Sequence, residues 1–134
     1  MVEGGDAGRM LAEAGLLPRE MPDNYTFRKV KEILAVLEEA EPERLGEAIA
    51  AARQMEVQGA LAAVIFTKHH LGGAHEVEVD RVEANEESEA LAVLVYEEGE
   101  LPLKVAHLPR EVKGGMRLRY DPVEGSYQSV SSAA

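Results

Sequence analysis

Several residue types that define common classes of protein chemistry are rare or missing in this chain of 134 residues. It has no cysteine, which excludes disulfides, thiolate nucleophiles and cysteine-ligated zinc. Tryptophan is absent and aromatic residues make up 4% of the chain, too few for a platform on which nucleic-acid bases stack. There is no apolar run of the ~18 residues that a membrane-spanning helix needs, and the first residues lack the pattern of a signal peptide. We therefore expect a cytoplasmic protein.

Positive charge is scarce as well. Lysine and arginine total 14 against 25 aspartates and glutamates, so the net charge is −11. Residues 76–100 contain ten acidic side chains and a single basic one, Arg81. Such a face repels nucleic-acid backbones and anionic membranes, so we expect neither as a partner. Two interpretations stay open: a solvated surface that keeps the protein dissolved, and an acidic patch that binds a basic protein as a nucleic-acid mimic.

A helical pattern fills residues 23–72 and predicts two to three helices. Apolar residues recur there every three or four positions, and Asn24 can cap the first helix. Pro42 fits the first turn of a second helix, where its missing N–H costs nothing. Residues 60–66 suit either a buried strand or a buried helix. Their alanines favour a third, central helix over about residues 57–70.

The hydrophobic period changes to two over residues 73–128, which predicts four to five strands in an antiparallel meander or a small β barrel. Helices followed by strands indicate an α+β fold, with the helical segment packed on the sheet. Four strand residues should point to a common interior: Val79, Val93, Leu103 and Leu118. Residues 1–22 are expected to form a flexible lead-in, unless their apolar patch docks on the body, and residues 129–134 a disordered tail.

Short motifs follow one another in the second half: Val79-Asp80-Arg81-Val82-Glu83, Ala92-Val93-Leu94, Leu101-Pro102-Leu103 and Leu108-Pro109-Arg110-Glu111-Val112-Lys113-Gly114-Gly115. In this order they resemble a small bacterial family catalogued as domain of unknown function 3006, over about residues 76–120. The chain departs from the family in a longer loop at residues 85–89 and in Gly114-Gly115, where an acid-glycine-acid turn is usual. The resemblance implies a compact β domain of barrel-like or strongly bent meander form and nothing catalytic.

Histidine is the residue type to examine first for a chemical site. His69, His70 and His75 lie around the Gly72-Gly73 turn, and imidazoles with a carboxylate can bind zinc or iron. Adjacent histidines on a helix point about 100° apart, so only one of His69 and His70 could join His75. We favour the interpretation that these histidines form the polar end of a helix, where they complement its dipole, over a metal site. The alternative is a small metal-dependent enzyme that uses His69, His75 and Glu76.

The sequence patterns of other enzyme classes are missing. There is no G-x-S-x-G nucleophile turn and no phosphate-binding G-x-x-x-x-G-K-[ST] loop. Paired carboxylates lie near predicted element ends or turns, where nothing shifts their pKa toward the range of a general acid or base. We therefore predict no catalytic residue, no resident metal, no cofactor and no enzymatic activity.

One basic cluster stands out, and it consists of Arg110, Lys113, Arg117 and Arg119. Arg117 and Arg119 are two apart on a predicted strand, so they share a face. One interpretation is cross-strand ion pairing with the acidic strand that contains Glu76, Glu78 and Asp80. The other is a ridge that contacts a small anion or a nucleic acid.

The function that we expect is non-catalytic binding or assembly, with a protein as the partner. The possible interaction surface is shared by the helices and the sheet: Phe27, Ile33, Leu37, Ile49, Arg117 and Arg119. A homodimer would use part of this face, since short amphipathic helices often bury one side on a partner. The main alternative is an acidic regulator or inhibitor that binds a basic protein through residues 76–100.

Overall fold

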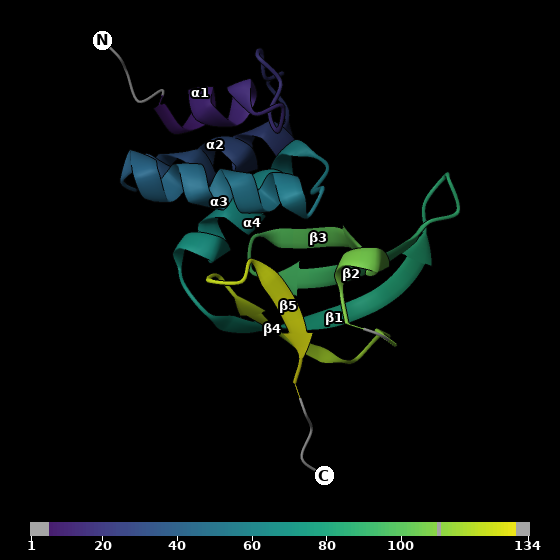
Figure 1. The fold of residues 1–134 in the computed structure, drawn as a ribbon. Coiled ribbons are helices and arrows are strands. Elements are labelled where there is room, and N and C mark those ends of the chain that lie inside the picture. Colours follow the sequence, from purple (N-terminus) through teal and green to yellow (C-terminus); the bar gives the residue numbers. More distant parts are fainter. Residues whose placement is uncertain (1–5, 110, 131–134) are drawn as a thin grey trace.

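The structure is a computed structural model that describes residues 6–109 and 111–130 (Figure 1). Within these ranges the chain forms four α-helices, then five strands and one 3-10 turn. The helices are α1 (Asp6–Glu13), α2 (Tyr25–Leu37), α3 (Pro42–Gln54) and α4 (Ala60–Leu71). The strands are β1 (His75–Ala84), β2 (Ala90–Tyr96), β3 (Gly99–Lys104), β4 (Arg117–Asp121) and β5 (Ser126–Ser129). The helices lie together on one side of the sheet (Figure 1).

Helices α2 and α3 begin at the expected signals. The Asn24 side chain accepts a hydrogen bond from the Phe27 N–H at 3.1 Å and so caps α2. Pro42 occupies the first position of α3. Both helices bury one apolar stripe, as their three- and four-residue spacing predicts.

Helix α4 lies at the centre of the fold. Residues 60–66 are helical, and all side chains from Ala62 to Thr67 are buried. The reason is that α2 and α3 pack against α4 on one side while the sheet covers the other (Figure 1). The buried Thr67 hydroxyl donates a hydrogen bond to the Ala63 carbonyl oxygen at 2.7 Å, which satisfies it inside the helix.

The sheet is antiparallel, with the strand order β3-β2-β1-β4-β5. The α+β class is confirmed, although α1 adds a helix to the two or three predicted. The prediction of a small β barrel is wrong, because β3 and β5 lie at opposite edges of the described sheet and do not pair. The prediction of a meander fails at the connection from β3 to β4, because β4 pairs with β1 instead of with β3.

Between β3 and β4 the chain crosses to the other side of β1. It passes through the 3-10 turn Val105–His107 and returns beside the middle of β1. There the Gly115 N–H donates to the Val79 carbonyl oxygen, and the Val79 N–H donates to that of Met116, both at 2.8 Å. A Cβ on Gly114 would lie 2.9 Å from the Asp80 carbonyl oxygen, so the two backbones can approach this closely only with glycine at position 114.

One hydrophobic core extends from the helices to the inner face of the sheet. Val79, Leu103 and Leu118 belong to it, as predicted. Val93 does not. It is buried on the outer face, opposite Arg81, because its neighbours on either side in β2 face the core.

The two ends of the described chain are packed. Ala7 and Leu11 of α1 are buried, as is Leu17, so this part of the predicted lead-in docks on the body. Ser129 belongs to β5, and the Val130 N–H donates to the Arg117 carbonyl oxygen at 3.1 Å, so these two residues extend the sheet edge and are not a disordered tail. Residues 1–5 and 131–134 lie outside the described residues. None of the helices in the described ranges has the length and apolarity to cross a membrane.

Candidate functional site

Three histidines and three tyrosines meet between the end of α4 and the inner face of the sheet. We name this group the His–Tyr cluster, and its members are His69, His70, His75, Tyr96, Tyr120 and Tyr127. The rings pack on one another, with centroids 4.2 Å apart for His69 and Tyr96 and 4.8 Å apart for Tyr120 and Tyr127. Because the tyrosines come from β2, β4 and β5 and His75 from β1, the cluster joins four strands to the end of one helix.

Hydrogen bonds run through the cluster in one direction. His75 Nδ1 lies 2.8 Å from the Gly73 carbonyl oxygen, which can only accept, so we assign the proton to this nitrogen. His75 Nε2 then accepts from the Tyr96 hydroxyl at 2.7 Å, and the Tyr96 oxygen accepts from the Tyr127 hydroxyl at 2.9 Å. Burial raises the pKa of both tyrosines, so both remain protonated donors.

His70 forms the second branch of the cluster, with its Nδ1 2.5 Å from the Tyr120 hydroxyl. Burial lowers the pKa of His70 and of His75 below the usual value of 6.5. The two imidazoles are therefore neutral at pH 7. No buried side-chain nitrogen or oxygen in the described residues lacks a hydrogen-bond partner. The cluster is therefore a polar part of the core in which the buried side-chain polar atoms form hydrogen bonds within the chain.

Glu98, at the turn between β2 and β3, holds the end of α4. Its carboxylate accepts hydrogen bonds from Lys68 Nζ at 2.5 Å and from His69 Nε2 at 2.8 Å. Burial alone would raise the pKa of Glu98, but these two hydrogen bonds outweigh it and lower the pKa to about 2. Lys29 of α2 donates to the Glu98 carbonyl oxygen at 3.2 Å, so the same turn also binds a second helix.

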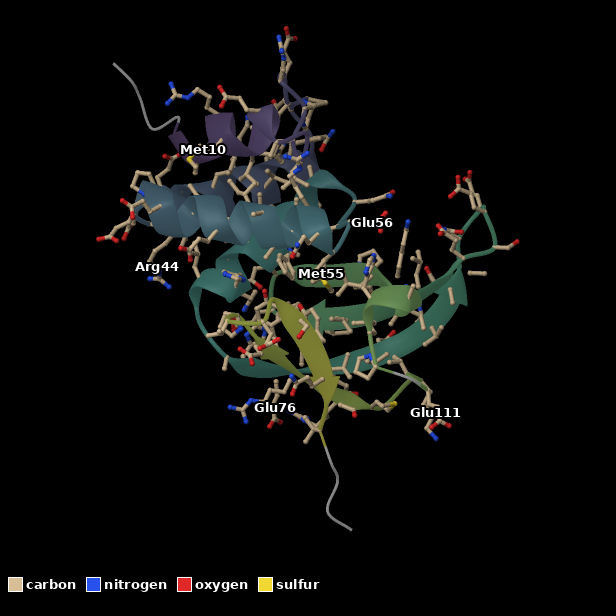
Figure 2. The ribbon with its side chains drawn as sticks, viewed as in Figure 1. Met10, Arg44, Met55, Glu56, Glu76 and Glu111 are labelled. Atoms are coloured by element: carbon tan, nitrogen blue, oxygen red, sulfur yellow. The ribbon has the colours of Figure 1, made fainter. Side chains whose placement is uncertain are left out.

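The structure does not assemble the metal-ligand set of the sequence alternative. The rings of His69 and His75 are 5.5 Å apart, but Glu76 points to the opposite face of the sheet, as neighbours in a strand do. There it lies away from the helices (Figure 2) and accepts a hydrogen bond from Arg117 Nε at 3.3 Å. In the part of the chain that is described, no group of three or more histidines and carboxylates is placed to hold a metal ion.

Arg117 and Arg119 lie on the outer face of β4, where the register sets them opposite Glu78 and Glu76. The cross-strand ion pair predicted for Arg117 is present and is made with Glu76. The Arg119 side chain is exposed and forms no hydrogen bond or ion pair with another described residue. Of the remaining members of the basic cluster, Lys113 is exposed in the loop before β4, and Arg110 lies outside the described residues.

Most of the apolar residues predicted as an interaction surface lie inside the protein. Ile33, Leu37 and Ile49 are only 6%, 1% and 5% exposed and belong to the core, and Phe27 is half-buried. Helical periodicity identifies the face that is buried but not what covers it. Here other elements of the same chain cover it, so these three positions are corrected from surface to core.

An open groove with a volume of about 940 Å³ runs between α1, the loop that follows it and α2. We name it the α1–α2 groove. Its floor is apolar and its rim is charged; the floor comprises Gly8, Ala12, Leu17, Pro18, Met21, Leu34 and Ala35, and the rim Arg9, Glu13, Arg19, Lys31 and Glu38. Sequence reasoning missed this groove because it treated residues 1–22 as a lead-in. The available signal was the apolar patch around Leu17.

The rim of the groove has three basic and two acidic residues, and one of the basic residues, Arg9, has an interaction partner of its own. One of the acids, Glu38, is already engaged, since its Oε1 accepts a hydrogen bond from the Ala7 N–H at 3.2 Å. The side chains of Arg19 and Lys31 are exposed and make no hydrogen bond or ion pair with the rest of the described chain. A chain of net charge −11 thus keeps two unpaired cations beside an apolar floor.

Comparison with known protein families, with curated proteins and with solved structures finds no match to this chain. The resemblance of residues 76–120 to domain of unknown function 3006 therefore stays a prediction. The α1–α2 groove, the outer face of the sheet and the His–Tyr cluster are the features that indicate function.

Proposed function

We propose that this protein is a non-catalytic binding module that takes a protein partner in the α1–α2 groove. The observation that carries the proposal is a groove open to solvent, whose floor presents exposed and half-buried apolar residues, Pro18, Ala35 and Met21 among them, beside cations that the described chain leaves unpaired. Apolar surface rimmed by polar residues is typical of interaction sites on soluble domains. A partner that covers this floor removes apolar area from water and supplies the missing charge partners.

The His–Tyr cluster supports a binding role over a catalytic one. Every histidine in the cluster uses at least one ring nitrogen within the chain, and both nitrogens of His75 are occupied. General acid–base catalysis needs a side chain within reach of a substrate proton, and Glu98 is held by Lys68 and His69. We assign the cluster the role of fastening α4 to the sheet, which gives the groove a rigid base.

An acidic regulator is the second candidate, and one observation on the outer face favours it. The Arg81 guanidinium makes hydrogen bonds of 2.7–3.2 Å to the carboxylates of Asp80, Glu83 and Glu100. One guanidinium cannot neutralise three carboxylates, so this part of the outer face is net negative. A basic protein bound there should dissociate as salt rises, because exposed charges are screened. A homodimer stays a prediction, which sedimentation at low and high salt tests.

Peptide selection tests the proposed groove. Peptides of about 16 residues displayed on phage are selected on the immobilised full-length protein. Ala35→Trp fills the groove from an exposed position, whereas Val36→Trp changes the neighbouring residue, which is 51% exposed and does not line the groove. We expect selected peptides to bind the wild type and Val36→Trp but not Ala35→Trp. Peptides that bind all three proteins equally would overturn the proposal, provided that circular dichroism shows both variants folded.

A further inference from the structure

We infer that the segment bound in the α1–α2 groove is a short amphipathic helix with acidic residues beside its apolar stripe. The inference rests on the proposed function, since it names the chemistry of what the groove binds. Three observations lead to it: the nature of the groove walls, their length, and the unpaired cations on the rim.

The groove walls favour a helical partner over an extended one. Two of the three walls are the helices α1 and α2, whose interior backbone N–H and C=O groups bond within their own helix. A peptide that binds by strand addition needs a free strand edge, and these walls offer none. A helix satisfies its backbone internally, so it can lie on side chains alone.

The length of the groove sets the size of that helix. On α2 the lining residues Lys31, Leu34, Ala35 and Glu38 follow one face at helical spacing. From Lys31 to Glu38 this face extends about 10 Å, which is close to two helical turns. Apolar anchors of the partner at positions i, i+3 or i+4, and i+7 would therefore cover the floor between the two charged ends.

The rim selects the charge of the partner. Arg19 and Lys31 have no carboxylate partner in the described chain, while Glu38 already caps α1 through the Ala7 N–H. An acidic side chain on the bound helix would pair with either cation, and a basic one would face them without compensation. Glu13 on the α1 side of the rim would repel an acidic side chain of the partner. The acidic residues of the bound helix should therefore lie beside its apolar stripe on the side that faces α2.

Two synthetic peptides of about 18 residues, long enough to form helix, test this chemistry. They share one leucine stripe and differ only in glutamate or lysine beside it, and fluorescence anisotropy measures their binding to the full chain. At about 50 mM salt we expect the acidic peptide to bind about tenfold more tightly, and about 500 mM salt should reduce that ratio to about threefold or less. The net charge of −11 would attract the basic peptide, so this preference cannot come from overall charge.

Charge reversal at the rim supplies the matched test. Arg19→Glu/Lys31→Glu should reverse the preference toward the basic peptide. The control Arg53→Glu/Lys113→Glu makes the same change in net charge at two exposed cations that do not line the groove, and it should keep the acidic preference. A reversal in both double variants would overturn the inference, because the effect would then be one of overall charge.

The remaining outcomes separate the inference from the proposed function. If both peptides bind wild type equally and neither binds Ala35→Trp, the groove binds helices without charge selection, and only the inference is overturned. If the basic peptide binds wild type and Ala35→Trp alike, the acidic outer face is the binding surface and both proposals fall. If neither peptide binds, the inference is overturned, and the phage selection still decides whether the groove binds any peptide.

Discussion

His75 lies at the first position of β1, where the chain has just left α4. Its Nδ1 holds the Gly73 carbonyl of the preceding turn and its Nε2 holds the Tyr96 hydroxyl, so one imidazole fixes the turn to the sheet. The Nδ1–H donates to the Gly73 carbonyl oxygen in either protonation state, but Nε2 can accept from the Tyr96 hydroxyl only in the neutral ring, which is the form that burial favours. The residue therefore acts as a structural pin whose strength depends on its protonation state.

Removing this imidazole should cost more than one hydrogen bond. His75→Phe leaves the Tyr96 hydroxyl without its acceptor in a buried position, and we expect the free energy of unfolding to fall by about 1–3 kcal/mol. In a Tyr96→Phe background the same change should cost less, because the unsatisfied hydroxyl is gone. Urea unfolding of the four proteins measures this coupling. Equal costs in both backgrounds would show that the hydrogen bond contributes nothing.

The two half-buried histidines, His70 and His75, also predict how stability depends on pH. In the folded chain burial lowers the pKa of His70 and His75 from the usual 6.5, so below pH 6.5 the unfolded chain binds protons that the folded chain does not. The free energy of unfolding should therefore fall as the pH drops below about 6.5 and be unaffected by these groups above it. The pKa of Glu98 is lowered to about 2, so its stabilising effect is lost only below about pH 4.5.

Urea midpoints between about pH 8 and about pH 5 measure this dependence. A His70→Gln/His75→Gln variant should be less stable at pH 8 but should show a flatter decline toward pH 5. An identical decline in wild type and variant would show that His70 and His75 are not the groups responsible.

At the scale of elements, local signals in the sequence predicted α2 and α3 and favoured a helix at α4, but they did not predict α1 or the order of the strands. The cap at Asn24, the proline at position 42 and the alanine-rich run at 60–66 act within a few residues of where they lie, and all three appear in the structure. The β1–β4 pairing joins residues about 40 positions apart, and no local pattern distinguishes it from a β3–β4 pairing.

The pairing of β4 with β1 depends on the close backbone contact at Gly114. Gly114→Ala would place a Cβ 2.9 Å from the Asp80 carbonyl oxygen, so the two strands must separate, and we expect a loss of about 1–3 kcal/mol in the free energy of unfolding. Gly72→Ala is the control, because its Cβ would meet its nearest neighbour at an ordinary 3.5 Å and the residue is exposed. Equal urea midpoints for the two variants would refute the role of the contact.

The candidate site shows the same division between local and distant information. The sequence singled out His69, His70 and His75, but their partners Tyr96, Tyr120 and Tyr127 come from three later strands, so their structural role was not predictable. The groove depends on residues of the first 22 positions, whose apolar patch is too short to distinguish docking from mobility. Arg117 and Glu76 were the exception, since alternating charges on two strands are themselves a pairing signal.

At the scale of the whole molecule, charge and apolar surface are distributed unevenly. The net charge of −11 arises largely from the second half, where Arg81 is the single base among ten acids of residues 76–100. Helix α1, which forms one wall of the α1–α2 groove, lies on the far side of the helical layer from the sheet (Figure 1), and the groove rim carries the unpaired cations Arg19 and Lys31. The molecule therefore presents two surfaces of opposite character, which is why salt dependence and charge reversal distinguish the two proposed modes of binding.

The burial of α4 on both sides has a consequence for biosynthesis. During translation the chain up to Leu71 emerges before the strands that cover Val64, Ile65 and Phe66 exist. At roughly 5–20 residues per second, the ribosome needs a few seconds to supply β1 to β3, and for that interval the apolar residues 60–66 of α4 are covered on one side only. Until the strands are made, the sheet-facing side of α4 is exposed to water and prone to aggregate. A ribosome that stalls between α4 and β1 would therefore hold a nascent chain whose apolar face chaperones must cover.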